Sequence, residues 1–291
     1  MGSRVREIVG ISFGKEYYKM IVNAGYRGKV GAAAPKFTYT GQYNQRDDGV
    51  IELLTSGTIT FLSPAVIDIF CVGGGGQGGS MIQTPGTIFG QGGGAGGYTT
   101  TLKKATVNGS YDISIGAGGR LYSGSAGGDG EKTSFGSIVT ANGGAGGGKT
   151  AWNGGNGGSG GGAGVVSNSG YGRGGSDGDN GQQGYPTDSG HAPGTGQGTT
   201  TREFGEATGK LYAGGGGGGR YMASSTPVVS MGGAGGGGAG AWAGSYSERK
   251  EATAGAANTG GGGGGTAGHY DTSRVYGGTG GSGIVCFRAA K

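Results

Sequence analysis

Apolar and polar residues alternate mainly in the first third of the chain and again in its last few residues. The segments concerned are rich in β-branched and aromatic residues and are bounded by Gly, Pro or Asn, as β-strands are. No segment shows the sustained 3.6-residue period of an amphipathic helix. The pattern predicts an all-β protein of sandwich or jelly-roll type. The predicted strands span residues 50–54, 58–62, 66–72, 98–102, 111–115, 134–140 and 284–288, with a hairpin turn at Asn108–Gly109.

The N-terminal segment contains a faint internal repeat. Residues 6–15 (REIVGISFGK) align with residues 19–28 (KMIVNAGYRG), and each copy reads as a short strand with a turn. The two copies predict a small β-rich attachment element, although an ordinary pair of strands with chance similarity would look the same. We therefore expect two regions: an attachment element and linker over residues 1–45, and a glycine-rich β-sandwich over residues 46–291.

Glycine runs fill most of the remaining chain. Glycine accounts for 84 of the 291 residues, which is roughly four times its usual share. With only 6 Pro and no fixed three-residue repeat, the chain is not collagen-like. The clearest runs are residues 73–79, 90–97, 143–148, 154–164, 214–219, 232–240, 260–265 and 277–283.

A single glycine run is expected to be a flexible linker, because ordering it is entropically costly and buries no side chain. Many runs of similar length can instead pack side by side as extended polyproline-II strands, since no Cβ atoms separate their backbones. Each backbone hydrogen bond would then contribute on the order of 1 kcal/mol. We therefore predict a polyglycine-II slab inserted into the sandwich.

The slab is expected to grow from one sheet, because the first and last long runs adjoin predicted strands. Residues 66–72 lead into the first run, and residues 284–288 follow the last one. The two strands are expected to share a sheet, which would bring Cys71 close to Cys286. A disulfide and a pair of buried free thiols are both compatible with that placement.

Charge and motif content argue against nucleic-acid, membrane and metal-binding functions. The formal net charge is +5, but the Lys and Arg residues are scattered, and an RGG element occurs only at residues 173–175. No apolar run is long enough to cross a membrane. The two Cys residues form no C-x-x-C pair, so no zinc site is expected. Asp177 and Asp179 could bind Ca²⁺, although a turn explains them as well.

Residues 143–150 (GGAGGGKT) fit the phosphate-binding pattern G-x-x-x-x-G-K-[ST]. A phosphate loop needs a helix directly after the lysine, and the residues that follow, AWNGGNGGSGGGAG, break helices. Two isolated histidines offer little for a catalytic triad, and no G-x-S-x-G elbow lies between a strand and a helix. We expect neither enzymatic activity nor a cofactor.

The segments between glycine runs are the candidate binding loops. If successive runs alternate in direction, residues 80–89, 149–153, 220–231 and 269–276 lie at the far tip of the slab, and residues 241–259 lie at the sheet end. Aromatic and arginine side chains are frequent anchors of recognition surfaces, although the same side chains could also form small satellite cores. The predicted receptor-binding residues are Met81, Ile82, Phe89, Trp152, Tyr221, Met222, His269, Tyr270, Arg274 and Tyr276.

Four sequence blocks give the chain a family resemblance: VIDIFCVGGGGQGG, GGYTTTLKKATVNGSYDISIGAGG, TSFGSIVTANGGAGGG and GGTGGSGIVCFR. Their order over residues 58–288 resembles the glycine-rich, polyglycine-II domains of phage and prophage tail-fibre tip proteins, which are receptor-binding adhesins. The residue 6–28 repeat also resembles short repeats of prophage tail proteins. The resemblance rests on block order rather than on a catalytic signature.

The resemblance implies a virion tail component, made in the host cytoplasm, that acts outside the cell. Its implied partners are a bacterial surface glycan or outer protein, reached through the tip loops. Other tail or fibre proteins would bind the N-terminal element, and a homotrimer is one assembly that the resemblance allows. It implies no nucleic-acid partner and no membrane insertion. A purely structural role, as fibre shaft, tip cap or assembly factor, is the alternative.

Overall fold

The computed structural model divides the chain into two compact units, Met1–Gly31 and Ala32–Lys291. The predicted attachment strands lie outside the described residues. The expected domain boundary at residue 45 lies inside the second unit, whose sheet includes β1 (Phe37–Tyr39) and β2 (Tyr43–Gln45). The structure describes residues 35–82, 89–120, 126–149, 152–166, 170–171, 185–187, 190–192, 201–221, 229–243, 249–268 and 274–291.

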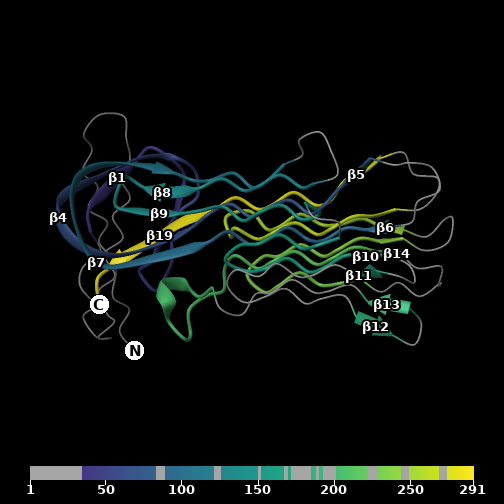
Figure 1. The fold of residues 1–291 in the computed structure, drawn as a ribbon. Helices are drawn as coiled ribbons and strands as arrows, with labels where there is room; N and C mark the ends of the chain where they lie inside the picture. Colours follow the sequence, from purple (N-terminus) through teal and green to yellow (C-terminus); the bar gives the residue numbers. More distant parts are fainter. Residues whose placement is uncertain are drawn as a thin grey trace, which may run out of the picture. The chain divides into compact units, whose positions relative to one another are not determined.

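The second unit is built on an eight-stranded antiparallel sheet, and the described residues include no α-helix (Figure 1). Its order is β2-β3-β19-β4-β7-β8-β9, with β1 also paired to β4. No helix among the described residues is long and apolar enough to span a membrane. The remaining strands of this sheet are β3 (Ile51–Leu53), β4 (Gly57–Val72), β7 (Thr99–Ser114), β8 (Thr133–Phe135), β9 (Val139–Ala141) and β19 (Ile284–Ala289).

Strands β4 and β7 each run for 16 residues and pair along their whole length. The hairpin turn expected at Asn108–Gly109 is therefore wrong: Gly109 lies inside β7, opposite Phe61. The register shifts just beyond that pair, and Gly109 has a φ of 74°, which glycine adopts without strain. The dipeptide thus marks an irregularity in a continuous strand rather than a chain reversal.

The strands that pair with β4 and β7 form two groups whose inner faces pack against each other, as in a sandwich. Strand β1 pairs with the first half of β4, and β19 pairs with the second half. Phe37 of β1 nevertheless contacts Phe287 of β19, with ring centroids 5.3 Å apart. Phe61 lies 6.0 Å from Phe287 and 6.4 Å from Phe135. These contacts confirm the predicted sandwich-like fold with an aromatic core.

Strand β19 is buried on both faces, and the two cysteines belong to different clusters on these faces. Val285 and Phe287 contribute to the aromatic core, whereas Ile284 and Cys286 belong to a second cluster with Phe70 and Tyr212. The expected pairing with β4 is confirmed, and Val285 lies directly opposite Cys71. Since neighbouring residues of a strand face opposite sides, Cys71 and Cys286 point into different clusters, and both are free thiols.

The glycine runs extend away from the sheet side by side and form a slab (Figure 1). Residues 73–79 show how it is held: every third N–H along this run donates to the same neighbouring segment, at 2.8–3.0 Å. A three-residue repeat requires three residues per turn, which is the geometry of polyglycine II. The N–H groups bond to residues 92–98, 128–131 and 278–281, and the carbonyl groups accept from residue 119 and from residues 144–147 and 263–266.

Glycine is needed in these runs because neighbouring backbones come too close for a Cβ atom. A Cβ built on Gly78 would lie 1.9 Å from the carbonyl oxygen of Gly264, and one on Gly263 would lie 1.8 Å from that of Gly278. The buried Gln77 breaks the run without breaking its hydrogen bonding. Its amide nitrogen donates to the Gly277 carbonyl at 3.3 Å, and its amide oxygen accepts from the Gly128 N–H at 3.2 Å.

Two of the glycine runs reverse direction internally, which corrects the expected order of the loops. Residues 234–236 form a turn in which Gly235 and Gly236 have φ values of 93° and 100°. Residues 237–243 then run outward, parallel to residues 214–221. The run of residues 154–164 also folds back, since the N–H groups of Gly161 and Gly164 donate to the Gly155 and Trp152 carbonyls. The expectation that all of residues 241–259 lie at the sheet end is therefore wrong.

Candidate binding surface at the distal end of the slab

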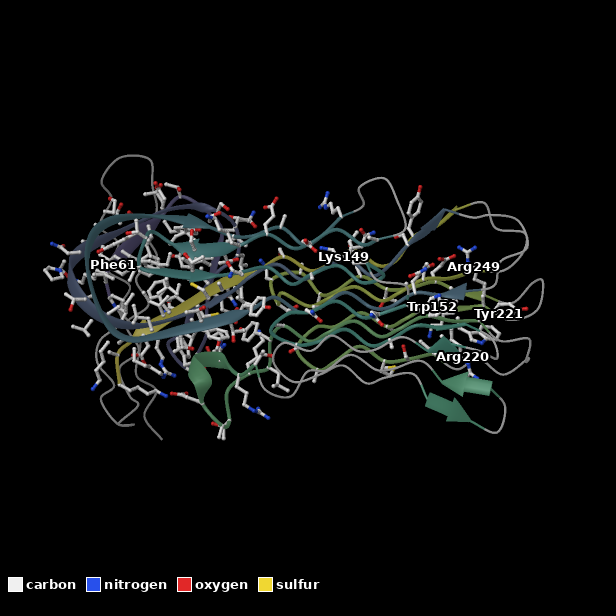
Figure 2. All side chains as sticks on the ribbon, in the orientation of Figure 1. Phe61, Lys149, Trp152, Arg220, Tyr221 and Arg249 are labelled. Atoms are coloured by element: carbon white, nitrogen blue, oxygen red, sulfur yellow. The ribbon has the colours of Figure 1, made fainter. Side chains whose placement is uncertain are left out.

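Short strands join the glycine segments where they end farthest from the sandwich, and we call this region the distal end (Figure 2). A five-stranded sheet has the order β11-β10-β14-β15-β16, and β17-β6, β18-β5 and β12-β13 form two-stranded sheets. The bounds are β5 (Met81–Ile82), β6 (Phe89–Gly90), β10 (Val165–Val166), β11 (Gly170–Tyr171), β12 (Tyr185–Thr187), β13 (Gly190–Ala192), β14 (Arg220–Tyr221), β15 (Trp242–Ala243), β16 (Arg249–Lys250), β17 (Ala267–Gly268) and β18 (Arg274–Val275).

Backbone pairing brings several predicted site residues together from distant parts of the chain. Arg274 pairs with Ile82, and Met81 pairs with Val275. Phe89 pairs with Gly268 of the following two-stranded sheet. The side chains of Met81, Ile82, Phe89 and Arg274 lie outside the described residues, as do Met222, His269 and Tyr270 entirely.

Trp152 and Tyr276 are the two predicted site residues whose side chains the structure describes as accessible. Trp152 is half-buried, and its carbonyl oxygen accepts a hydrogen bond from the Gly164 N–H at 2.9 Å. This bond fixes the tryptophan beside the start of β10. Tyr276 directly follows β18 and is 51% exposed. An accessible aromatic ring at the end of a rigid segment is a suitable platform for stacking against a ligand.

Tyr221 does not belong to the accessible surface on which we expected it. It lies in β14, is 6% exposed and packs in a small cluster with Ala241, Ala243 and Ala267. Ala243 of β15, which pairs with Tyr221 in parallel, is one of the residues of this cluster. That pairing follows from the internal reversal at residues 234–236, because this turn returns the chain to the distal end beside β14.

The same reversal brings residues to the distal end that the sequence reasoning had placed elsewhere. Arg249 and Lys250 form the edge strand β16, where both are exposed, and Arg249 forms an ion pair with Glu251. Trp242 precedes them in β15 and is 2% exposed. The sequence did contain a signal for this placement. The segment WAGSYSERKE, between two glycine runs, has the same mixture of aromatic and charged residues as the segments that we assigned to the distal end.

Lys149 is not free for the phosphate-binding role that its sequence pattern suggests. Its ammonium group lies 2.6 Å from the Asp129 carboxylate, and the same carboxylate accepts from the Gly146 N–H at 2.8 Å. Both side chains are exposed, and Lys149 lies partway along the slab rather than at its far tip, where we expected it (Figure 2). Residues 153–156, which follow, form another extended segment of the slab. The described residues around Lys149 therefore lack the helix that a phosphate loop requires.

A second candidate cluster lies at the sandwich, where ligand atoms of Glu52, Glu203 and Cys286 come within 4.8 Å of one another. Arg46 contacts Glu203 at 2.7 Å and Glu52 at 3.4 Å. Lys210 lies 3.4 Å from Glu52. Both carboxylates therefore have cationic partners, and Arg46 also binds the Asp48 carboxylate at 2.5 Å. Burial raises the pKa of the Cys286 thiol well above its usual value. A metal would need the thiolate and would compete with Arg46, so this cluster is better explained as a closed ion-pair network.

The network holds residues 201–212 against the outer face of β4. The Tyr212 hydroxyl donates to Glu203 at 3.2 Å, and the Tyr212 and Phe204 rings pack on Phe70. A neighbouring network adds Glu206, which accepts hydrogen bonds from Arg288. These bonds, together with the positive charges nearby, lower the pKa of Glu206 to about 2.

Fold and surface together define an all-β sandwich from which a hydrogen-bonded glycine slab extends and carries short strands and loops at its distal end. The chain belongs to the glycine-rich domain family, whose sequence model matches residues 54–290. This range begins just after β3 and contains both the paired strands β4 and β19 and every glycine run of the slab. No protein of curated function matches the chain.

Proposed function

We propose that the chain is a receptor-binding protein of a phage or phage-tail-like particle, which recognises the bacterial cell surface through loops at the distal end. The proposal rests mainly on one observation: the sandwich provides the folded core, and the slab provides a separate surface distant from it. The sandwich contains the side-chain core, whereas the slab places segments from many parts of the chain at a single distant end. Binding residues commonly lie on loops that a rigid scaffold positions.

Two further points support this function over catalysis. The order of the sequence blocks resembles that of tail-fibre tip proteins, and the titratable clusters described at the sandwich are ion pairs that hold elements together. At the distal end, Trp152 and Tyr276 supply accessible rings, and Arg249 and Lys250 supply exposed cations on an edge strand. Ring stacking and charge-assisted hydrogen bonds are the interactions with which proteins bind surface glycans.

The test is binding of the purified, fluorescently labelled full chain to a panel of bacterial cells, followed by flow cytometry. The double variant Trp152→Ala/Tyr276→Ala is expected to bind at least tenfold less to any strain that binds the parent chain. Tyr43→Ala is the matched control, because Tyr43 is 49% exposed, close to the 51% of Tyr276, and lies at the sandwich. Equal loss in both variants would contradict a distal binding surface.

The alternative function, a structural tail component such as a shaft, tip cap or assembly factor, has one observation in its favour. Tyr221 and Trp242 are buried at the distal end, so part of its aromatic content packs the slab rather than facing a ligand. A folded chain that binds no cell of a strain to which the particle adsorbs, and that does not compete with the particle, would favour this alternative.

A further inference from the structure

A cavity of about 610 Å³ lies at the sandwich, beside the bulge that follows Phe61 in β4. Lys36, Lys104 and Lys291 line it together with apolar walls that include Pro64, Val66 and Ala290. Leu62 and Val66 are 63% and 50% exposed, and Val66 is part of the lining. The site therefore combines three cations with an apolar surface.

Two of the three lysines of this cavity lack the carboxylate partners that most cations of the sandwich have. Among the described residues, Lys36 and Lys104 form no ion pair, and Lys291 lies 3.5 Å from Glu206. By contrast, Arg46, Lys210 and Arg288 each lie within 3.4 Å of a carboxylate. The cavity thus contains two lysines, Lys36 and Lys104, without a carboxylate partner among the described residues, in a region where charges are otherwise paired.

The backbone conformation of Lys104 is a second, independent observation about this site. Lys104 has a φ of 55°, in the left-handed region that costs free energy for a residue with a Cβ atom. It lies at a bulge where Lys103 and Lys104 together oppose Asp68, and its N–H donates to the Asp68 carboxylate at 3.1 Å. Bulges redirect side chains and recur next to functional sites. Glycine would fit this position without strain, yet the chain carries a lysine.

We propose that this cavity binds an acidic, partly apolar peptide segment of a partner protein, and that Lys104 is a main contact for its carboxylates. The volume exceeds what a single small anion needs, and the Pro and Val walls suit aliphatic side chains between the acidic ones. A nucleic acid would require a longer basic track and stacking rings, whereas the walls here are aliphatic. The partner is the kind of protein that would hold this chain by its sandwich while the distal end remains free.

Fluorescence anisotropy tests the proposal with the full chain and a labelled short peptide of repeated Glu-Ala-Leu. The parent chain is expected to bind this peptide in a salt-sensitive manner and to leave the matching Gln-Ala-Leu peptide unbound. Lys104→Gly is expected to bind about tenfold more weakly, because a charge-assisted contact is lost, while its melting temperature stays the same or rises. Lys132→Gln, at an exposed lysine outside the cavity, is the matched control and is expected to bind like the parent.

Four results would overturn the proposal: no binding of the Glu peptide to the parent chain, equal binding of the Gln peptide, undiminished binding by Lys104→Gly, or tighter binding of inorganic polyphosphate than of the Glu peptide. The outcome is independent of cell recognition, since Trp152→Ala is expected to leave peptide binding unchanged. Failure of the cavity and failure of the distal surface are therefore distinguishable.

Discussion

The sandwich and the slab are held together by opposite means, although one chain passes repeatedly between them. In the sandwich, Phe61, Phe135 and Phe287 fill the space between two groups of strands. In the slab, residues 73–79 bond to six neighbouring segments through backbone groups, and hardly a side chain intervenes. Cohesion in the first region depends on side-chain volume, and in the second it depends on the absence of side chains.

The largest expected effect of a single substitution is therefore a methyl group added inside the slab. Gly78→Ala would place a Cβ atom 1.9 Å from the Gly264 carbonyl oxygen, so a backbone segment with its hydrogen bonds must move. We expect a loss of about 5 kcal/mol or more in the free energy of unfolding, measured by denaturant titration. Gly49→Ala is the control: its φ is 83° and nothing lies within 4 Å of the added Cβ, so about 1 kcal/mol is expected. Similar losses for both variants would contradict the close packing of the slab.

In the sandwich, we expect the loss of stability to depend on how much side-chain volume a substitution removes from the core. Phe287 is fully buried and contacts the Phe37 and Phe61 rings. Phe287→Ala should lower the free energy of unfolding by about 3–5 kcal/mol, whereas Phe287→Leu, which leaves a smaller cavity, should cost less than half as much. Denaturant titration of both variants measures the gradation. If both substitutions cost the same, side-chain volume would not be what governs this region.

Residues 201–212 join the two regions, and their ion pairs make this joint pH-dependent. Hydrogen bonds from Arg288 lower the pKa of Glu206 from 4.5 to about 2. Because the pKa is lower in the folded chain, the stabilisation is complete above pH 4.5 and is lost as the pH falls towards about 2. We expect the melting temperature of the parent chain to fall by a few degrees over this range. The curve of Glu206→Gln should be flatter there, and parallel curves would contradict the assignment.

The smallest expected effect belongs to the lysine of the phosphate-loop pattern. Lys149 pairs with Asp129 on the surface, with both side chains about half exposed. Such pairs contribute less than about 1 kcal/mol, so Lys149→Ala should change the melting temperature by less than about 2 °C and leave cell binding intact. Isothermal titration of the parent chain with ATP and Mg²⁺ provides the control. Binding that disappears in Lys149→Ala would restore the phosphate-loop hypothesis.

The sequence predicted those parts of the fold that side chains mark. Apolar alternation located β19, and it located β4 as two separate strands, residues 58–62 and 66–72, which the structure joins into one. The position of these strands next to glycine runs predicted the pairing of β4 with β19, which the register of Val285 opposite Cys71 confirms. The reversals within residues 154–164 and 232–240 could not be predicted, because isolated Asn, Ser and Ala residues interrupt straight glycine runs as well as turns. Gly235 and Gly236 differ from their neighbours only in backbone φ.

The candidate surface was predictable to a similar degree. The alternation of runs correctly joined distant segments, as the pairing of Ile82 with Arg274 shows. It could not tell that Tyr221 is covered, because this depends on β15 returning to the distal end through an unmarked turn. The ion-pair network that includes Glu203 and Tyr212 was not predicted either. Its partners Arg46 and Glu52 are distant in sequence, and no local pattern joins them.

Hydrogen–deuterium exchange of the full chain at neutral pH tests the central claim most directly, because it compares slab and sandwich amides in one sample. If backbone hydrogen bonds hold the slab, peptides covering residues 73–79 and 260–266 should exchange as slowly as those covering β4 and β19, since protection follows the opening of hydrogen-bonded structure. Exchange of the glycine peptides at the rate of an unstructured chain, while β4 and β19 stay protected, would show that the glycine runs are flexible linkers and would contradict the account.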